Sequence, residues 1–327
     1  MDLSGKKFTV IGGAGFVGSH LVDHLLMHDP REIRVLDNLK RGTRANLQPA
    51  LTDPRVELIE ASITDERAIR DAVRGVDGVF HLAALWLDEC VKHPRSAVDV
   101  NIRGTFNVIE ACQLEGVERT VYSSSASVYG NPLEIPMTEE HPFNNRTFYG
   151  ATKIAGEQMF RAFNEVHQLD YVGLRYMNIY GPRMDDKGIY VSVIVKVLAQ
   201  LDQGLAPRIY GDGTQSYDFI HVSDVARANV LAMTSDATDE FFNIGAGVRT
   251  TITDLVTKIL ELTGASIEPE YQAEGMTFVT HRIGSTEKAR RELGFEAEVT
   301  LEAGLADVIA WWRRSNVGAS VSAAPGG

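Results

Sequence analysis

The segment GGAGFVGSHLVDHLL, residues 12–26, decides the fold of this 327-residue chain. The apolar run KKFTVIG at 6–12 precedes it and is typical of a buried strand, and FVGSHLVDHLLMH at 16–28 has the pattern of an amphipathic helix. Three glycines, Gly12, Gly15 and Gly18, occupy the turn between them. Glycine allows a tight turn and close approach of the backbone to a pyrophosphate at the helix N-terminus. The segment therefore predicts a dinucleotide-binding strand–turn–helix unit.

An acidic residue closes the next predicted strand, IRVLD at 33–37. Asp37 follows Gly18 by 19 residues, the spacing at which a carboxylate binds the hydroxyls of an adenosine ribose. The same carboxylate would repel a 2′-phosphate, so NAD is favoured over NADP. Lys40 and Arg41 leave NADP open as the alternative, because basic residues at this point can accommodate that phosphate.

Further strands and helices alternate along the first half of the chain. Strands are predicted at 56–61, 78–84, 119–125 and 171–176, and helices near 65–74, 95–115 and 149–167. Alternation of this length implies right-handed βαβ units. We therefore expect an α/β fold with a Rossmann-type, doubly wound parallel sheet.

The pattern loosens after Gly181-Pro182, where a smaller lobe is expected. Helices are predicted around 190–203, 223–234 and 252–264, and short strands at 219–222 and 241–245 are expected to rejoin the first sheet. The predicted domains are an NAD-binding domain over 1–180 with returning segments near 217–245, an interleaved α/β substrate lobe over 181–314, and a disordered tail over 315–327.

Composition excludes several classes of protein. The formal net charge of −12 argues against nucleic acid as a partner, and two cysteines are too few for a disulfide framework or a zinc site. No apolar run reaches the length of about 18 residues needed to span a bilayer. The first predicted strand begins so early that no room is left for a signal peptide. We expect a cytoplasmic protein with no metal and no membrane partner.

The segment YGATK at 149–153 carries the chemistry. Tyr149 and Lys153 are four residues apart, so on a helix their side chains are neighbours. A lysine cation favours the phenolate, and is expected to lower the tyrosine pKa from its usual value near 10. The pair therefore predicts a general base for a sugar hydroxyl.

These and other motifs, taken in order, resemble the extended short-chain dehydrogenases, and specifically the NAD-dependent nucleotide-sugar epimerases and dehydratases of the UDP-glucose 4-epimerase type. The motifs that carry the resemblance are GGAGFVG (12–18), Asp37 in DNL, HLAA (81–84), SSSASVYG (123–130), YGATK (149–153), RYMNIYGPR (175–183) and YDFIHVSDVA (217–226). The similarity extends to about residue 314.

The resemblance implies a role for many residues. Ser125, Tyr149 and Lys153 are the expected catalytic residues, with Ser124 as the alternative to Ser125. The residues expected to bind NAD are Gly12, Gly15, Phe16, Val17, Gly18, Asp37, Asn38, Ile63, Leu82, Ala83, Ala84, Asn101, Ser123, Tyr149, Lys153 and Tyr176. The residues expected to bind substrate are Trp86, Ser125, Tyr149, Asn178, Val191, Tyr210 and Tyr217. Trp86 has a second interpretation as a core residue, and Asn178 as a turn residue.

The residues after the serines separate the reactions of the family. Similar 4,6-dehydratases carry an Asp-Glu pair where this chain has Ala126 and Ser127, and the decarboxylases usually carry a glutamate there. Their absence favours oxidation and re-reduction at C4 alone, and so a 4-epimerase acting on a nucleotide-diphosphate hexose of the UDP-glucose/UDP-galactose type. The alternatives are an NAD(P)H-dependent 4-keto-sugar reductase and a non-catalytic nucleotide-binding protein.

The diphosphate contact is left open by the sequence. The family often has an arginine where this chain has Tyr217, and Arg183, Arg208 and Arg282 are the candidates to replace it, each with a second interpretation as a surface residue. By resemblance we also expect a homodimer formed through the helices at 95–115 and 150–165.

Overall fold

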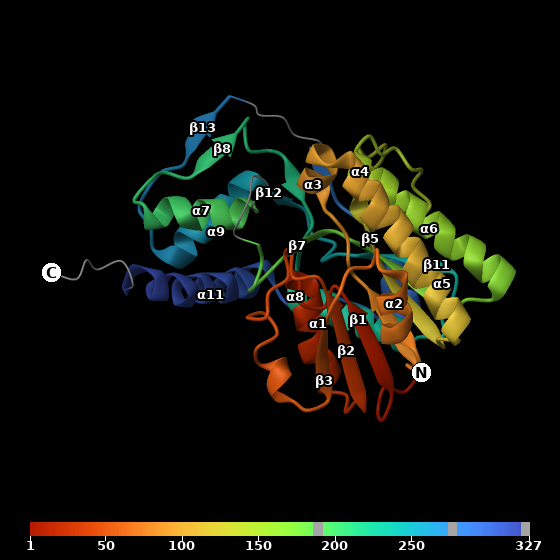
Figure 1. The fold of residues 1–327 in the computed structure, drawn as a ribbon. Coiled ribbons are helices and arrows are strands. Elements are labelled where there is room, and N and C mark those ends of the chain that lie inside the picture. Colours follow the sequence, from red (N-terminus) through yellow and green to blue (C-terminus); the bar gives the residue numbers. More distant parts are fainter. Residues whose placement is uncertain (186–191, 274–279, 322–327) are drawn as a thin grey trace.

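A parallel seven-stranded sheet forms the centre of the larger lobe in the computed structural model, which describes residues 1–185, 192–273 and 280–321 (Figure 1). The strand order is β11-β6-β5-β4-β1-β2-β3, and all neighbouring strands are parallel. Its strands are β1 (Lys7–Ile11), β2 (Glu32–Asp37), β3 (Val56–Glu60), β4 (Gly78–His81), β5 (Arg119–Ser125), β6 (Tyr171–Tyr176) and β11 (Glu240–Ile244). The predicted Rossmann-type α/β fold is confirmed.

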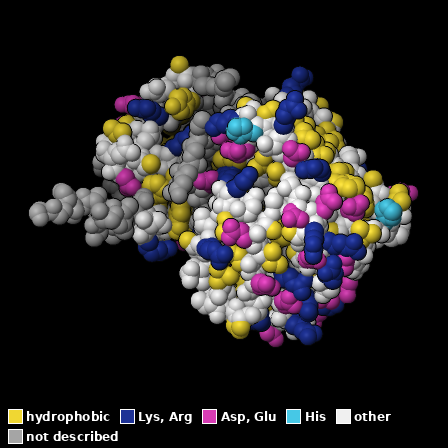
Figure 2. Space-filling view, viewed as in Figure 1, with side chains coloured by type: hydrophobic (Ala, Val, Ile, Leu, Met, Phe, Trp, Pro, Cys, Tyr) yellow, Lys and Arg dark blue, Asp and Glu magenta, His cyan; other side chains and the backbone are white. Residues whose placement is uncertain are grey.

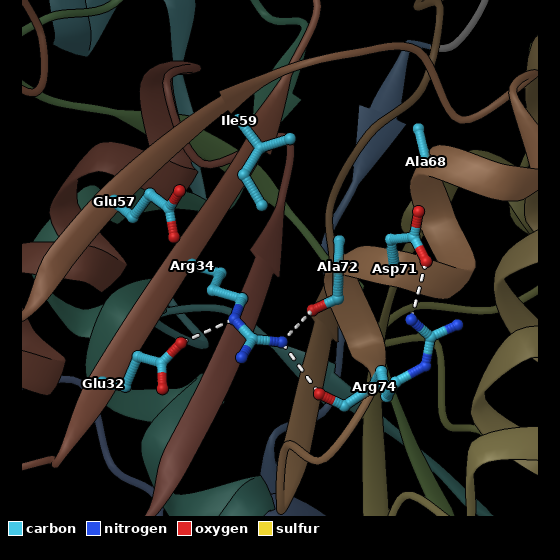
Figure 3. A pocket seen from close by; sticks show the side chains of 8 residues that line it. All are labelled: Glu32, Arg34, Glu57, Ile59, Ala68, Asp71, Ala72 and Arg74. Atoms are coloured by element: carbon cyan, nitrogen blue, oxygen red, sulfur yellow. Dashed lines mark hydrogen bonds and ion pairs between the residues drawn. The ribbon is translucent and has the colours of Figure 1, made fainter.

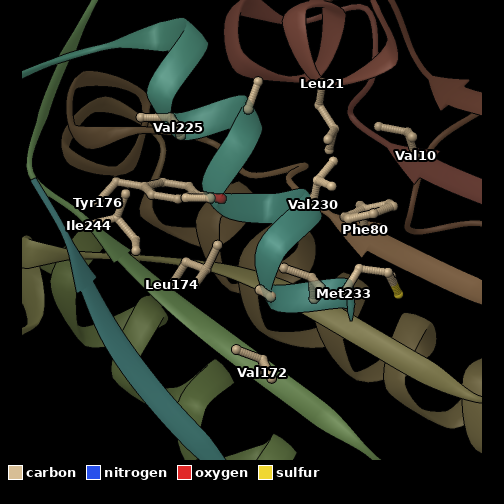
Figure 4. Close-up of a cluster of buried hydrophobic side chains, with 14 of the residues drawn as sticks. Val10, Leu21, Phe80, Val172, Leu174, Tyr176, Val225, Val230, Met233 and Ile244 are labelled. Atoms are coloured by element: carbon tan, nitrogen blue, oxygen red, sulfur yellow. The ribbon is translucent and has the colours of Figure 1, made fainter. Parts of the chain in front are cut away.

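Helices cover both faces of this sheet (Figure 1). One face carries α1 (Phe16–Leu26) and α8 (Val222–Thr234), whose apolar side chains meet those of β1, β4, β6 and β11 (Figure 4). The other face carries α2 (Glu66–Val73), α5 (Thr105–Glu115) and α6 (Phe148–His167). Because both faces are covered, central strands such as β6 are buried along their whole length.

The predicted helix over 95–115 consists of three helical pieces in succession. They are α4 (Pro94–Ala97), a π-helical segment η2 (Val98–Gly104) and α5. A π-helical segment inside a helix often marks a functional position. Here it places Asn101, one of the predicted cofactor-binding residues, next to the loop that follows β4.

The smaller lobe has its own apolar core, formed mainly by α7 (Val193–Asp202), α9 (Ile252–Thr263) and α11 (Leu301–Val321). Short strands complete it: β8 (Arg208–Tyr210) pairs with β13 (Glu270–Gln272), and β9 (Ser216–Tyr217) lies between β12 (Thr250–Thr251) and β14 (His281–Arg282). The remaining elements are η1 (Ala50–Thr52), α3 (Leu87–Lys92), η3 (Ala126–Val128), β7 (Asn178–Tyr180), β10 (Phe219–His221) and α10 (Glu287–Leu293).

The two strands expected to rejoin the first sheet behave differently. β11, from the predicted segment 241–245, pairs with β6 as expected. The prediction for 219–222 was wrong, because β10 pairs with β7 in a separate two-stranded sheet. The physical reason is that β11 already occupies the hydrogen-bonding edge of β6.

The C-terminal helix also differs from expectation. α11 continues to Val321, into the region from 315 where the sequence predicted a disordered tail; residues 322–327 lie outside the described residues. Once the packed turns have formed, each further helical residue adds a hydrogen bond at little cost. The predicted domain boundaries near 180 and 314 stay predictions. No helix in the described ranges is both long and apolar enough to cross a membrane.

Candidate active site

The predicted site residues converge because parallel strands end at one edge of the sheet. Gly12 follows β1, Asp37 ends β2, Leu82 follows β4 and Ser125 ends β5. Tyr149 and Lys153 come to the same edge from the first two turns of α6, whose start is capped by the Thr147 hydroxyl accepting a hydrogen bond from the Gly150 amide.

The glycine turn is packed so closely against its own backbone and that of the loop after β4 that two of its glycines have no room for a side chain. A Cβ at Gly12, where φ is +83°, would lie 2.7 Å from the Ala83 amide nitrogen, and a Cβ at Gly18 would lie 2.3 Å from the Gly12 carbonyl oxygen. Gly15 is the N-cap of α1 and no side chain caps that helix. The first amide groups of α1 are therefore available to an anion, which fits a dinucleotide pyrophosphate.

Asp37 is buried and oriented by two backbone groups. Its Oδ2 accepts a hydrogen bond from the Ala14 amide at 3.0 Å, and its Oδ1 accepts one from the Leu39 amide at 2.9 Å. Burial raises the pKa of this carboxyl, while the two amides act in the opposite direction. A carboxylate has further lone pairs, so Asp37 can still accept hydrogen bonds from two ribose hydroxyls.

Arg41, the residue that kept NADP open, is occupied elsewhere. Its guanidinium carbon lies 4.0 Å from the centroid of the Trp86 ring, and it forms an ion pair with Asp185. These contacts hold the Arg41 guanidinium over the loop after β4. Arg41 is therefore already paired, and would have to leave these partners to bind a 2′-phosphate next to Asp37. The contact between Arg41 and Trp86 was not predicted, because the two residues are far apart in the sequence.

The other predicted cofactor residues lie in different surroundings. Ile63 is buried against Gly104, where a Cβ would lie 2.7 Å from its Cδ1. The Leu82 and Ala83 amides both donate to the Ile11 carbonyl, so HLAA is held directly beside the end of β1. Phe16 packs against the core of the smaller lobe, Val17 packs against the core of the larger lobe, Ala84 is partly buried and Asn38 is exposed.

Lys153 and Tyr149 form the centre of the site. The Lys153 ammonium donates a 2.7 Å hydrogen bond to the Ser123 carbonyl and lies 5.8 Å from the centroid of the Tyr149 ring. Burial lowers the pKa of Lys153 to about 8. Burial also raises the pKa of Tyr149 to about 12, against a hydrogen bond with Ser125 that lowers it.

The sequence-based expectation of a lowered tyrosine pKa is therefore wrong for the protein without ligands. Desolvation of the phenolate outweighs the cations around it, among which Arg282 and Arg41 lower the Tyr149 pKa. Burial also disfavours the charged form of Lys153, as its lowered pKa shows.

The two candidate serines are adjacent on β5 and point to opposite faces of the strand. Ser125 lowers the pKa of Tyr149, and its Oγ accepts a 3.1 Å hydrogen bond from the Ser127 amide. Ser124 points to the other face of the strand, where its hydroxyl donates to Glu157 Oε1 at 2.5 Å. Ser125 is the serine that faces the site.

Asn101 holds the loop after β4 against α6. Its side-chain oxygen accepts from the Leu85 amide at 2.7 Å, and its amide group donates to the Leu85 carbonyl at 2.8 Å and to Thr152 Oγ1 at 3.0 Å. Ser123 and Tyr176 are also buried, and their hydroxyls form a 2.9 Å hydrogen bond. These hydrogen bonds fix the loop after β4 relative to α6, and β5 relative to β6.

The predicted substrate residues are less tightly gathered. Trp86 has one ring face covered by Arg41, Asn178 begins β7, and Tyr217 is half-buried on β9. Tyr210, on β8, is 51% exposed. Val191 lies outside the described residues.

Of the three candidate arginines, Arg282 is the one that acts electrostatically on Tyr149. Arg183 is bound to Asp23 of α1 at 2.7 Å, and Arg208 is exposed on β8. Arg282, on β14, pairs in register with Tyr217 and interacts electrostatically with Tyr149.

A hollow of about 540 Å³ lies away from this edge, at the start of β2 and beside α2 (Figure 3). Its arginines are already paired within it: Arg34 donates to Glu32 and to the Ala72 and Arg74 carbonyls, and Arg74 donates to Asp71. We assign it no catalytic role.

Comparisons with known proteins agree with this geometry. A family model described as the NAD dependent epimerase/dehydratase family matches residues 8–245. A putative UDP-glucose 4-epimerase of Methanocaldococcus jannaschii is 34% identical over 94% of this chain and 98% of its own length. A dTDP-glucose 4,6-dehydratase of Actinoplanes and a UDP-glucuronic acid decarboxylase of Arabidopsis thaliana also match, each at 32% identity.

Solved structures give the same result. The UDP-N-acetylglucosamine 4-epimerase of Methanobrevibacter ruminantium, in complex with UDP-N-acetylmuramic acid, superposes with a TM-score of 0.91 at 31% identity, covering 95% of this chain and 99% of that one. The UDP-glucose 4-epimerase of Thermotoga maritima, with UDP-glucose, has a TM-score of 0.88 at 33% identity, covering 94% and 99%. The glycine turn, Asp37 and the Ser125–Tyr149–Lys153 group thus stand in a chain that belongs to the NAD-dependent epimerase/dehydratase family.

Proposed function

We propose that this protein is a 4-epimerase of nucleotide-diphosphate hexoses that works through a transient 4-keto sugar. The observation that carries the proposal is the placement of a tyrosine, a lysine and a serine at the cofactor edge, without a carboxylate at the two positions after the serine. Ala126 is buried there, and the Ser127 hydroxyl accepts a 3.1 Å hydrogen bond from Ser125. Dehydration or decarboxylation by the routes of similar enzymes would need an acid at one of those positions.

In the proposed reaction, Tyr149 removes the proton from the C4 hydroxyl and Ser125 holds the reacting oxygen by a hydrogen bond. Bound NAD supplies the hydride acceptor, and brings a positive charge into the site that favours the phenolate. Lys153, fixed by the Ser123 carbonyl, holds its positive charge beside the phenol. The protein orients the sugar so that the proton leaves the C4 hydroxyl oxygen and the hydride leaves C4.

Return of the hydride to the other face of the 4-keto sugar completes an epimerisation with no net redox change. Relatives named UDP-glucose 4-epimerase support a uridine nucleotide and the gluco/galacto pair as the substrates to try first. The rival 4-keto-sugar reductase would instead consume one added NAD(P)H per turnover. A nucleotide-binding protein without catalysis would turn over no sugar.

The test is incubation of the purified protein with UDP-glucose, UDP-glucuronate or UDP-N-acetylglucosamine without added cofactor, with the products separated by chromatography. We expect the C4 epimer of at least one of them. Tyr149→Phe should lower kcat by a factor of about 10³, because a general base typically contributes 10²–10⁴. Equal turnover by wild type and Tyr149→Phe would contradict the mechanism. In a parallel incubation with added NADH, its stoichiometric consumption would favour the reductase.

We also propose a homodimer formed through α5 and α6. Hydrophobic side chains gather over the α4–α6 side of the molecule (Figure 2), and the exposed ones include Phe106 and Leu114 on α5 and Phe148 and Val166 on α6. Burial of such a surface is favourable. Sedimentation of wild type and of Phe106→Glu tests this: a monomeric variant and a dimeric wild type are the expected result.

A further inference from the structure

We propose that the hexose carries a carboxylate, and that Arg282 binds it in a cavity lined also by Ser127 and Thr147. The inference rests on the proposed function and deepens it, because it replaces the neutral UDP-glucose favoured by the sequence with a nucleotide-linked hexuronate. It comes from an arginine whose Nε is buried and has no hydrogen-bond partner among the residues that the structure describes.

Arg282 lies at the edge of the smaller lobe that faces the catalytic residues. Its strand β14 pairs with β9, so that Arg282 stands opposite Tyr217. Its Nε is buried and has no hydrogen-bond partner, and within the described ranges its guanidinium forms no ion pair. The groups that act on its charge are two phenols, those of Tyr217 and Tyr149.

A cavity of about 80 Å³ adjoins this guanidinium. The residues that line it are Leu87, Ser127, Gly130, Asn131, Asn145, Arg146, Thr147 and Arg282. This lining carries two positive charges and no carboxylate. Asn145 and Thr147 are bonded to each other, which leaves the two arginines, Ser127 and Asn131 to meet a ligand.

The size of the cavity fits a small anionic group. A cavity of 80 Å³ has room for a small group such as a carboxylate. A guanidinium binds a carboxylate through a planar pair of hydrogen bonds. A buried guanidinium nitrogen without a partner is costly, and a bound anion removes that cost.

The position of the cavity favours a group near C4 over the diphosphate. Tyr149 is the base for the C4 hydroxyl in the proposed reaction, Thr147 of the cavity lining precedes it by two residues, and Ser127 of the lining is hydrogen-bonded to Ser125 at 3.1 Å. In a hexopyranose, C4 and the diphosphate-bearing C1 lie at opposite ends of the ring. C6 is attached to C5, next to C4, so the anionic group closest to Tyr149 is a C6 carboxylate.

The experiment compares UDP-glucuronate and UDP-glucose as substrates of wild type, Arg282→Met and Arg282→Lys. We expect wild type to have a kcat/KM for UDP-glucuronate at least about tenfold above that for UDP-glucose, since a charged hydrogen bond contributes this much or more. Arg282→Met should lower the ratio of the two values by about 30-fold, and Arg282→Lys should restore part of it. Arg290→Met, at an exposed position on α10, is the matched control and should keep the wild-type ratio.

The outcomes separate this inference from the proposed function. Epimerisation of UDP-glucose with a wild-type preference for that neutral sugar, or an equal loss for both sugars in Arg282→Met, would overturn the carboxylate site and leave the epimerase standing. Conversion of neither sugar, or of no nucleotide sugar at all, would overturn the inference together with the proposed substrate. Isothermal titration of Tyr149→Phe with each sugar gives the same comparison without turnover, and tighter binding of UDP-glucuronate that Arg282→Met abolishes is the supporting result.

Discussion

Ser124 and Glu157 are joined by a 2.5 Å hydrogen bond on the face of β5 opposite to that of Ser125. Arg175 binds the same carboxylate through two nitrogens, at 2.9 and 2.8 Å, and all three side chains are buried. Tyr129 extends the group, because its hydroxyl accepts a hydrogen bond from Arg175 at 2.8 Å. This buried network anchors the serine strand to α6, the helix that carries Tyr149.

Substitutions of the two neighbouring serines should therefore have different effects. Ser124→Ala removes a hydrogen bond to a buried carboxylate and should lower the free energy of unfolding by about 1.5–3 kcal/mol, with little effect on kcat. Ser125→Ala should lower kcat by roughly 10²-fold and leave the unfolding free energy close to that of wild type, because its loss falls on the reacting oxygen. Urea unfolding and steady-state kinetics on both variants check this; a reversed pattern would assign the catalytic role to Ser124.

Lys153 should make stability depend on pH in the alkaline range. Its pKa is about 8 in the folded protein and 10.5 as the reference value, so between these values the unfolded chain binds more protons. The free energy of unfolding contributed by Lys153 therefore rises with pH from 8 to 10.5, by at most about 1.4 kcal/mol per pH unit. Urea unfolding of wild type and Lys153→Met at pH 7 to 10 measures it, and a difference between them that is constant with pH would contradict the folded-state value.

Asp37 should control the choice between the two nicotinamide dinucleotides. Asp37→Asn keeps the size of the side chain and removes the charge, so NAD affinity should fall by roughly tenfold and the discrimination against NADP should shrink. Arg41→Ala is the control, because its side chain is held by Trp86 and Asp185, and the ratio of affinities should stay as in wild type. Titration with NADH and NADPH followed by fluorescence gives both ratios.

Two glycines of the turn should differ in their tolerance of a methyl group. A Cβ at Gly18 would lie 2.3 Å from the Gly12 carbonyl oxygen, whereas a Cβ at Gly15 would lie 3.2 Å from the same atom. Gly18→Ala should therefore force α1 away from β1 and cost about 1–3 kcal/mol of unfolding free energy. Gly15→Ala should cost less in stability and act mainly on NAD binding. Thermal unfolding with and without NAD separates the two effects.

Local patterns predicted the parts of the fold whose signal lies within a few residues. The glycine turn, the acid at the end of β2 and the Tyr149–Lys153 spacing each follow from strand or helix geometry, and parallel strands necessarily bring their ends to one edge. The two predictions that were wrong both depended on long-range contacts. The pairing of 219–222 depended on β11 lying at the edge of β6, and the pKa of Tyr149 depended on the burial of its phenol.

The sequence by itself thus determined the sheet class, the cofactor edge and the family, because the turn, the acid and the catalytic helix are short segments with their own geometry. Only the tertiary structure decided which serine faces Tyr149, that Arg41 stacks on Trp86, and that the Arg282 Nε is buried without a partner among the described residues. Side chains far apart in the chain meet only after the two lobes pack, and the unpartnered Arg282 nitrogen is the feature from which we infer the ligand.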